Sequence, residues 1–435
     1  MFNKNHLIDK VKTSMMELNN KQIEREEEIS MLILTLFAKK NLLFVGEPGV
    51  SKTGLLDMFL GVLSDGNTFK CTIKDDTKYE ELFGDRYFDE SGKMIYDFSN
   101  SMIDAHIARL DEIWKGNSKI LNSLLSATSN YRVVDIRGKG EVKIPNISTF
   151  AASNELPTDQ ALEALHDRFI VAMIVKPIKD NENWLKFISR RYDKSSILQN
   201  KFLLAEIEYI YKESFKVQID ISIYKTILSI KNKIKSINIA CSDRRFDGAI
   251  EILQVSAFLN RRDYVDETEL FLLVHMLWKL ETDIEKVYKI IFEEIFGNLD
   301  EVKKVVIYNE NRMNKLLGYK DGHLKDFLKF RKSFDHSLKE LFENQLEQVK
   351  SFQNELDIVI NGFQSVMSHY ENVVDIEKNI AKNLFLPNYK NHIYVNIDIE
   401  AIKNHLSLLN LEYQNIKEWL DENSQLYVYN SKVSR

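Results

Sequence analysis

Residues 42–54 constrain the fold more than any other segment of the chain. They read Leu-Leu-Phe-Val-Gly-Glu-Pro-Gly-Val-Ser-Lys-Thr-Gly. The apolar run predicts a buried strand, a glycine-containing turn follows it, and helix-like sequence begins at Lys52. A strand that passes through such a turn into a helix N-terminus is the arrangement of a phosphate-binding P-loop, whose backbone N–H groups face the phosphates. Ser51 replaces the usual last glycine of that pattern, so the segment alone also fits a strand, turn and helix without a ligand.

The P-loop interpretation assigns chemistry to individual side chains. The ammonium group of Lys52 would reach the β- and γ-phosphate oxygens of a nucleotide, and the hydroxyl of Thr53 would bind Mg²⁺. The expected nucleotide-binding residues are Gly46, Glu47, Pro48, Gly49, Val50, Ser51, Lys52, Thr53 and Gly54.

A second motif, Asp111-Glu112, follows the apolar stretch 107–110. We expect that stretch to be a strand, although Arg109 fits a fully buried strand poorly. An acidic pair at a strand end downstream of a P-loop has a specific use. Asp111 can help to hold Mg²⁺, and Glu112 can polarise the water that attacks the γ-phosphate. Taken alone, an Asp-Glu pair more often lies on a solvated helix face.

Two further polar residues follow in the same order along the chain. Asn154 ends a strand-like stretch, where its amide can orient the attacking water or simply cap a turn. Arg168, within Asp-Arg-Phe, offers a guanidinium that can act in trans on the nucleotide of a neighbouring subunit. Because four such motifs occur in this order at predicted strand ends, the sequence predicts a nucleotide hydrolase.

The composition restricts the class of protein. The 435 residues suffice for two or three domains, and five prolines and fifteen glycines favour helices over an all-β fold. The net charge of −6 gives no overall attraction to nucleic acid or anionic membrane. The two cysteines, Cys71 and Cys241, are too few and too far apart for a disulfide framework or a zinc cluster. No window approaches the roughly 18 apolar residues of a membrane span, so we expect a soluble, cytoplasmic protein without one.

Three regions follow from the patterns along the chain. Strand candidates alternate with helical stretches at 42–45, 69–73, 107–110, 148–152 and 169–175. That alternation predicts a parallel sheet with flanking helices and a ligand at the strand C-terminal ends. Two hairpins, 86–96 and 131–144, interrupt it, and helical sequence follows, with Ser242 as a candidate N-cap. We expect an α/β nucleotide-binding core at 1–180, an all-α domain at 181–285 and a mainly helical extension at 286–435.

The C-terminal extension carries two heptad seams. In the first, apolar residues recur every seven positions at Phe342, Val349, Leu356, Phe363 and Tyr370, and again at Phe352, Val359, Val366 and Val373. A second seam runs from Ile399 to Leu420. Narrow apolar seams of this kind predict long helices. We expect an antiparallel hairpin in which 399–420 covers the first seam and which binds a partner. Pairing of the seam with another chain is the alternative.

Together these motifs resemble the MoxR branch of the AAA+ ATPases, and most closely its RavA-type members. The segment 46–53 is similar to the Walker A of this branch, in which a small residue also tends to replace the last glycine. The segments 110–127, 151–157 and 162–168 resemble its Walker B, sensor 1 and arginine-finger regions, and 242–258 resembles its sensor 2 helix. The similarity covers about 5–285. Arg109 departs from it, because the branch carries an apolar residue there.

The resemblance implies an AAA+ module with an all-α lid, with ATP and Mg²⁺ as its cofactors. It assigns phosphate and metal binding to Lys52, Thr53 and Asp111, and catalysis to Glu112, Asn154, Arg168 and Arg244. An arginine finger needs a neighbour, so the resemblance also implies a homo-oligomeric ring of six subunits. Whether Arg244, the sensor 2 arginine, acts within its own subunit or on the next one stays open.

Two functions compete at this stage. The first is an ATP-driven, chaperone-like remodeller that rearranges or activates a protein partner, such as a von Willebrand A domain protein. The alternative is a nucleic-acid-acting AAA+ ATPase of a phage-defence or restriction system. Its one hint is the hairpin at 131–145, where four basic residues stand against two acidic ones. The lysine decarboxylase partner of RavA is not carried over, because 286–435 is too short and too helical for the β-rich module that contacts it.

Overall fold

The computed structural model describes residues 2–136, 138–157, 160–189, 198–297 and 375–387, with isolated positions at 354, 358, 361, 368, 372 and 411. Contacts divide the chain into two compact units. Unit 1 comprises Met1–Ile295 and Asn379–His392, and unit 2 comprises Phe296–Lys378 and Ile393–Arg435. All the predicted site residues lie in unit 1.

A parallel sheet of five strands forms the centre of unit 1, in the order β2-β5-β8-β1-β9. Its strands are β1 (Leu42–Val45), β2 (Thr68–Thr72), β5 (Ile107–Asp111), β8 (Ser148–Ser153) and β9 (Val171–Ile174). The five predicted strands are confirmed, with ends that differ by no more than two residues. The strand β1 lies between β8 and the edge strand β9 and is fully buried, so the loop after it leaves the sheet one strand in from that edge.

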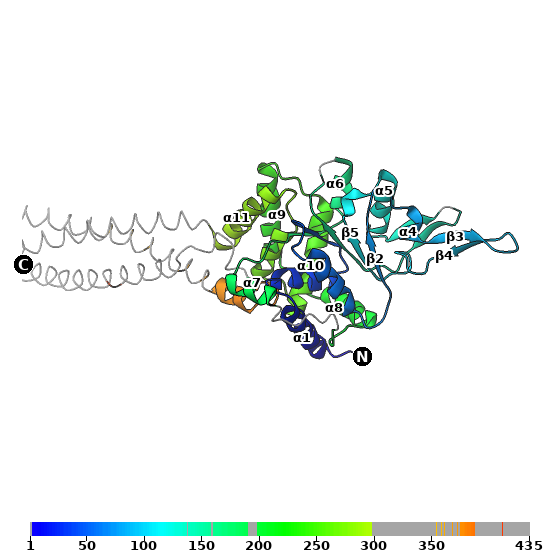
Figure 1. Cartoon of the computed structure of the whole chain (residues 1–435). Helices are drawn as coiled ribbons and strands as arrows, with labels where there is room; N and C mark the ends of the chain where they lie inside the picture. The colour runs from blue at the N-terminus through cyan, green and yellow to red at the C-terminus, as the bar shows by residue number, and fades with distance from the viewer. Residues whose placement is uncertain are drawn as a thin grey trace, which may run out of the picture. The chain divides into compact units, whose positions relative to one another are not determined.

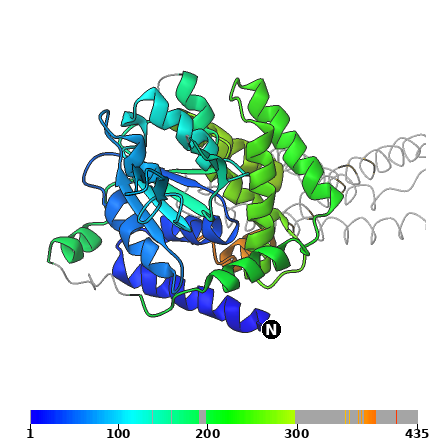
Figure 2. The same cartoon turned by 90° about the vertical axis from the view of Figure 1, so that its right-hand side faces the viewer.

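Helices flank this sheet, as Figure 2 shows. They are α1 (Lys4–Lys21), α2 (Glu26–Phe37), α3 (Lys52–Phe59), α4 (Tyr79–Phe83), α5 (Ser118–Ala127) and α6 (Gln160–His166), with short 3₁₀ turns η1 (Leu60–Val62) and η2 (Ile113–Lys115). The second helix is buried along almost its whole length, because it contacts α1, β9 and the helices α8 and α10 described below.

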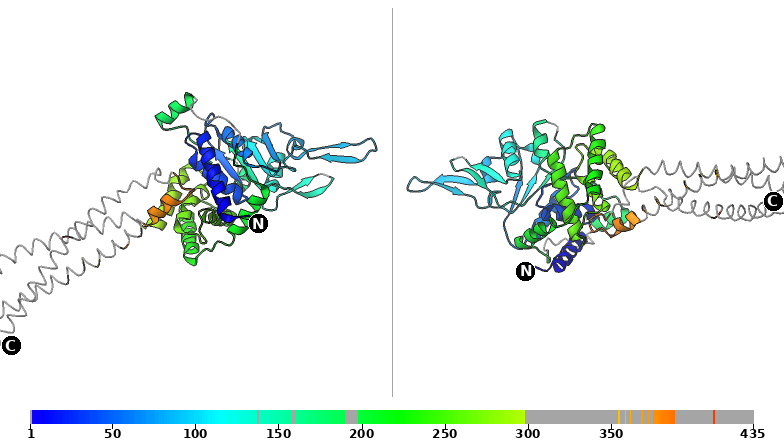
Figure 3. Two further views of the ribbon diagram at one scale, coloured as in Figure 1. Left: turned by 90° about the horizontal axis from the view of Figure 1, so that it is seen from below. Right: turned by 180° about the vertical axis from the view of Figure 1, so that it is seen from behind.

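Both predicted hairpins are present and extend from the same side of the core (Figures 1 and 3). The first pairs β3 (Asp85–Phe88) with β4 (Met94–Asp97), and the second pairs β6 (Val133–Ile136) with β7 (Gly140–Lys143). They touch each other, since the Lys139 ammonium lies 4.7 Å from the Phe98 ring centroid and 5.7 Å from that of Tyr96. Arg132 turns inward and donates to Asn41 and Asn146 and to two backbone carbonyls. Two of the four basic residues of the second hairpin are therefore engaged within the chain.

A helical region follows the sheet. Its elements are α7 (Asn181–Ile188), α8 (Leu204–Ser214), α9 (Ile221–Ser236), α10 (Asp243–Leu259), the 3₁₀ segment η3 (Glu267–His275) and α11 (Glu281–Phe296). The elements from α8 to α11 are referred to below as the lid. Ser242 caps α10 as predicted, because its hydroxyl accepts the N–H of Arg245 at 3.2 Å. The lid packs on the core through α2, which contacts both α8 and α10.

A segment from the far end of the chain completes the lid. Phe385 is 1% exposed, and Asn383 donates to Glu269 at 3.1 Å and accepts from Asn260 at 3.0 Å. This segment, orange in Figure 2, belongs to unit 1. The described positions of the C-terminal region at 354–382 and at 411 are helical. The residues named above for the two heptad seams all lie outside the described ranges, so the predicted hairpin stays a prediction. Among the described residues, no helix is both long and apolar enough to cross a bilayer.

Candidate nucleotide-binding site

The loop after β1 has the backbone of an anion-binding turn. Gly46 accepts no side chain, because a Cβ there would lie 2.4 Å from the carbonyl oxygen of Val175. Gly49 has φ +88°. Ser51 has φ +66°, so the serine adopts the left-handed backbone that a glycine adopts more readily. The helix α3 starts directly afterwards at Lys52, and its free N–H groups face the loop.

Lys52 lies at the centre of the candidate site. Its ammonium donates to the carbonyl oxygens of Gly46 at 2.6 Å and Glu47 at 2.8 Å, and to Oδ1 of Asn154 at 2.9 Å. Burial lowers the pKa of Lys52, while the carboxylates of Asp111 and Glu112 oppose that change. The predicted P-loop lysine and the predicted sensor asparagine are thus in direct contact, although 102 residues separate them.

The two predicted metal ligands are also together. The hydroxyl of Thr53 donates to Oδ2 of Asp111 at 2.8 Å, and Oδ1 of Asp111 accepts the backbone N–H of Glu112 at 3.0 Å. Within the described ranges, no group of three or more His, Cys, Asp and Glu side chains could hold a metal by itself. A hydroxyl and one carboxylate fit Mg²⁺ that arrives with a nucleotide, because Mg²⁺ uses few protein ligands and completes its shell with phosphate and water.

The predicted base is held by two polar groups. Oε1 of Glu112 accepts from the Asn154 amide at 2.6 Å, and its Oε2 lies 3.3 Å from the Lys115 ammonium. The backbone of Glu112 is left-handed, with φ +52°, which starts the turn η2 and directs this residue away from the strand. Lys52, Asn154, Glu112 and Lys115 therefore form one chain of contacts across the ends of β1, β8 and β5.

The two predicted arginines form a different cluster, at the junction of core and lid. Asp167 accepts from Arg244 at 2.9 Å and from the hydroxyl of Ser242 at 2.7 and 2.9 Å, and it also pairs with Arg245 at 3.3 Å. Burial and the nearby Arg244 both lower the pKa of Arg168. Arg168 thus directly follows Asp167, the residue to which Arg244 bonds.

One residue that the sequence analysis did not predict, Arg25, bonds to the backbone of the P-loop. Arg25, 6% exposed, donates to the carbonyl oxygens of Val50 at 3.1 Å and Lys176 at 2.9 Å. It also lies 3.8 Å from the buried carboxyl of Glu28. Next to it, the carboxylate of Glu24 accepts the backbone N–H groups of Lys179 and Asp180, just before α7. The charged run before α2 was visible in the sequence, but nothing in it indicated these distant partners.

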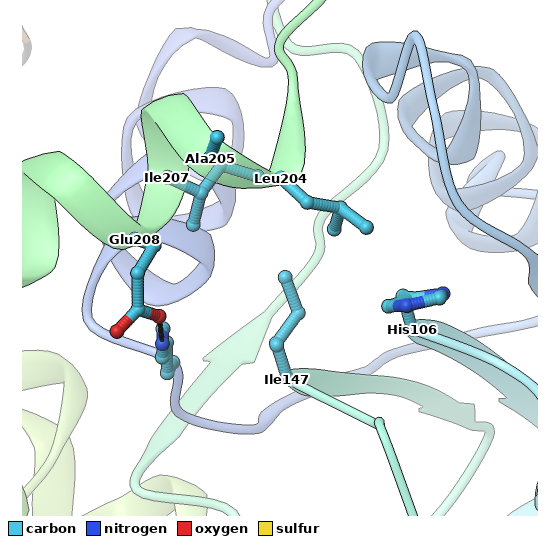
Figure 4. A pocket seen from close by; sticks show the side chains of 7 residues that line it. His106, Ile147, Leu204, Ala205, Ile207 and Glu208 are labelled. Carbon is cyan, nitrogen blue, oxygen red and sulfur yellow. Dashed lines mark hydrogen bonds and ion pairs between the residues drawn. The ribbon is translucent and has the colours of Figure 1, made fainter. Parts of the chain in front are cut away.

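A hollow of about 320 Å³ lies away from this site (Figure 4). It is lined by Lys39, His106, Ile147, Leu204, Ala205, Ile207 and Glu208. His106 and Ile147 directly precede β5 and β8, so the hollow adjoins the strand ends opposite the P-loop. Its polar groups are already engaged, because Lys39 pairs with Glu208 and His106 Nδ1 accepts the N–H of Asn67. It contains none of the predicted site residues.

Family comparisons agree with this geometry. The family described as the MoxR domain in the MoxR-vWA-beta-propeller ternary systems matches residues 9–201, and the AAA lid domain family matches residues 222–291. An uncharacterized protein of Methanocaldococcus jannaschii is 31% identical over 369 residues, which cover 80% of this chain and 96% of that protein. That coverage exceeds the share of the chain that ends at Ile295, so the similarity includes part of the C-terminal region.

Other similar proteins match smaller parts. A second uncharacterized protein of the same organism is 33% identical over 291 residues, 66% of this chain and 74% of that protein. A structural protein of Acidianus two-tailed virus is 28% identical over 174 residues, 38% of this chain and 27% of that protein. A crystal structure described as a "putative ATPase" from Cytophaga hutchinsonii has the same fold. Its TM-score is 0.55 at 18% identity, over 67% of this chain and 96% of that one.

Proposed function

We propose that this chain, which belongs to the MoxR family of AAA+ ATPases, hydrolyses ATP and uses the energy to rearrange a protein partner. One observation carries the hydrolytic part of the proposal. Lys52 contacts Asn154, which contacts Glu112, while Thr53 contacts Asp111 beside them. These are the groups that phosphoryl transfer to water requires, and they meet at the ends of adjacent strands.

The contacts suggest how the residues act. When ATP binds, the Lys52 ammonium leaves the carbonyl oxygens of the loop and Oδ1 of Asn154 and donates to phosphate oxygens instead. Oδ1 of Asn154 can then orient a water, while the NH₂ group of Asn154 still donates to Glu112. Glu112 then accepts a proton from that water as the water oxygen attacks the γ-phosphorus, and the bond from the γ-phosphorus to the bridging oxygen breaks so that ADP leaves. Lys115 and Asn154 keep the Glu112 carboxylate in place. Bound Mg²⁺, held at Thr53 and Asp111, would neutralise charge on the β- and γ-phosphates.

The arginine cluster supports assembly into a ring. Arg168 and Arg244 both lie at Asp167, whereas Lys52, Glu112 and Asn154 form their own set of contacts. A second copy that binds next to this cluster would offer its nucleotide to both arginines. We therefore propose a homo-oligomeric, hexameric ring, as in the RavA-type members that the motifs resemble, with Arg168 acting across the subunit interface.

The partner we propose is a von Willebrand A domain protein. The matched family is named for systems that combine a MoxR domain with a vWA protein. The C-terminal extension is the proposed recruiting element, and the contacts of Asn383 with Asn260 and Glu269 are its proposed attachment to the lid. The nucleic-acid alternative has less support, because Arg132, one of the four basic residues behind it, donates to Asn41 and Asn146 inside the chain.

Glu112→Gln protein tests both parts of this proposal. It should bind ATP like the wild type, yet release phosphate about 10² to 10⁴ times more slowly, the usual contribution of a general base. Lys52→Ala should instead lose nucleotide affinity. ATP-loaded Glu112→Gln protein, used as bait in its native host, should recover a vWA domain protein. Recovery of nucleic acid alone would favour the alternative, and wild-type turnover by Glu112→Gln would remove the catalytic assignment.

A further inference from the structure

Arg109 is a charged residue in the middle of a buried strand. It lies in β5 two residues before Asp111, so the two side chains point to the same face of the sheet. Its side chain is only 9% exposed, and its guanidinium lies between two carboxylates. Nε is 3.2 Å from Oδ1 of Asp57, and Nη1 is 3.5 Å from Oδ2 of Asp111. These carboxylates compensate the buried charge, which explains how the strand accommodates an arginine.

Two contacts link the P-loop helix α3 to the end of β5. They involve four side chains, those of Thr53, Asp57, Arg109 and Asp111. Thr53 and Asp57 are four residues apart on α3, so they occupy one face of the helix on successive turns. Thr53 donates to the Asp111 oxygen that Arg109 also contacts, and Asp57 pairs with Arg109 one turn further along. The contact of Thr53 with Asp111 joins the two proposed metal ligands directly. The ion pair of Asp57 with Arg109 joins the helix and the strand that carry them.

We infer that Arg109 and Asp57 are positioning residues for the proposed metal site. They fix α3 against β5 so that the Thr53 hydroxyl and the Asp111 carboxylate keep the separation that a shared Mg²⁺ requires. Mg²⁺ demands near-ideal octahedral geometry at about 2.0–2.1 Å, so a small displacement of either ligand weakens it. This inference rests on the proposed function.

A purely electrostatic role of Arg109 predicts the opposite change in metal affinity when Arg109 is lost. A guanidinium near a divalent cation repels it, so loss of Arg109 would then tighten metal binding, whereas loss of Asp57 would weaken it. Positioning predicts that loss of either residue weakens the metal. It also predicts that the double variant is no worse than a single one, because both residues act through one contact.

The test uses Mn²⁺ as the probe, titrated into the full chain with ADP and followed by electron spin resonance. Arg109→Met, Asp57→Asn and the double variant should each raise the Mn²⁺ dissociation constant by about 10- to 100-fold, the usual effect of losing an outer-shell partner. The affinity for ADP in excess EDTA should stay within about twofold of wild type, which a general disruption of the site would not allow.

Lys70→Met is the matched control. Lys70 pairs with the same Asp57 oxygen at 3.0 Å but is 48% exposed at its side chain, so its loss should leave Mn²⁺ binding unchanged. Arg109→Lys carries the test if Arg109→Met does not fold, because lysine keeps the positive charge but lacks the planar group that reaches both carboxylates. Positioning predicts weaker Mn²⁺ binding by Arg109→Lys, and a purely electrostatic role predicts no change. Unchanged or tighter Mn²⁺ binding in the Arg109 or Asp57 variants would overturn the inference alone. Absence of Mn²⁺·ADP binding by the wild type would refute the proposed function itself.

Discussion

Replacing Phe385 by alanine should release the C-terminal segment from the lid. The ring is 1% exposed, and truncation of a buried phenylalanine costs about 3–5 kcal/mol. Detachment also removes the contacts of Asn383 with Asn260 and Glu269. Glu269 is fully buried and would lose the Asn383 amide as a hydrogen-bond donor, while its ion pair with Arg262 stays, so the lid beneath the segment should loosen as well. By the same reasoning, truncation of the chain before residue 379 should destabilise the lid and should not leave residues 1–295 with their full stability.

Backbone amide exchange measures this effect locally. A loss of 3–5 kcal/mol corresponds to about 10²- to 10⁴-fold faster exchange. We expect it in η3 and around Asn383, with β1 and α3 unaffected. Leu411→Ala is the control, because Leu411 is 62% exposed in the C-terminal region and should change neither segment. Exchange of η3 at the wild-type rate in Phe385→Ala would refute the view that this segment stabilises the lid.

Three further predictions concern burial, the lid contact and the ring. Burial raises the pKa of Glu28 to about 7, with Arg25 opposing the shift. The folded protein therefore binds a proton between pH 4.5 and 7 that the unfolded chain does not, and stability falls as the pH rises through that window. Glu28→Gln should gain up to about 3 kcal/mol at pH 8 and almost nothing at pH 4, as measured by denaturant unfolding at both values. Asp167→Asn should lower stability by about 3 kcal/mol, because Arg245 is buried and loses its counter-charge; an unchanged melting temperature would contradict this. Arg168→Ala should bind ATP but hydrolyse it poorly, and mixing it with Glu112→Gln subunits should restore activity; no recovery in mixed rings would show that Arg168 acts within its own subunit.

The parts of the site that the sequence predicted are local or follow from strand order. Lys52 and Thr53 belong to one loop and helix. Asn154 follows β8, which is next to β1 in the sheet, and Asp111 ends β5, which is next to β8. Parallel strands bring such ends together, so contacts across 58 and 102 residues were foreseeable.

The supporting contacts were not foreseeable, because they depend on how side chains meet after the elements pack. Arg25 reaches Lys176 across 151 residues, and no pattern around either position indicates that bond. Arg109 was visible as an anomaly in a strand, but its partner Asp57 lies on a helix whose rotation the sequence does not reveal. Arg132 suggested a basic surface, yet it turns inward onto Asn41. The charge content of a segment therefore did not predict which partners its charged side chains would contact.

The bound nucleotide tests the central claim most directly. Wild-type and Glu112→Gln proteins are incubated with ATP and Mg²⁺ and freed of excess nucleotide, and the bound nucleotide is then released and identified by chromatography. We predict ADP on the wild type and intact ATP on Glu112→Gln, because only the wild type has the carboxylate that activates water. ADP on both proteins would contradict the role of Glu112, and no nucleotide on either would contradict the P-loop assignment on which the account depends.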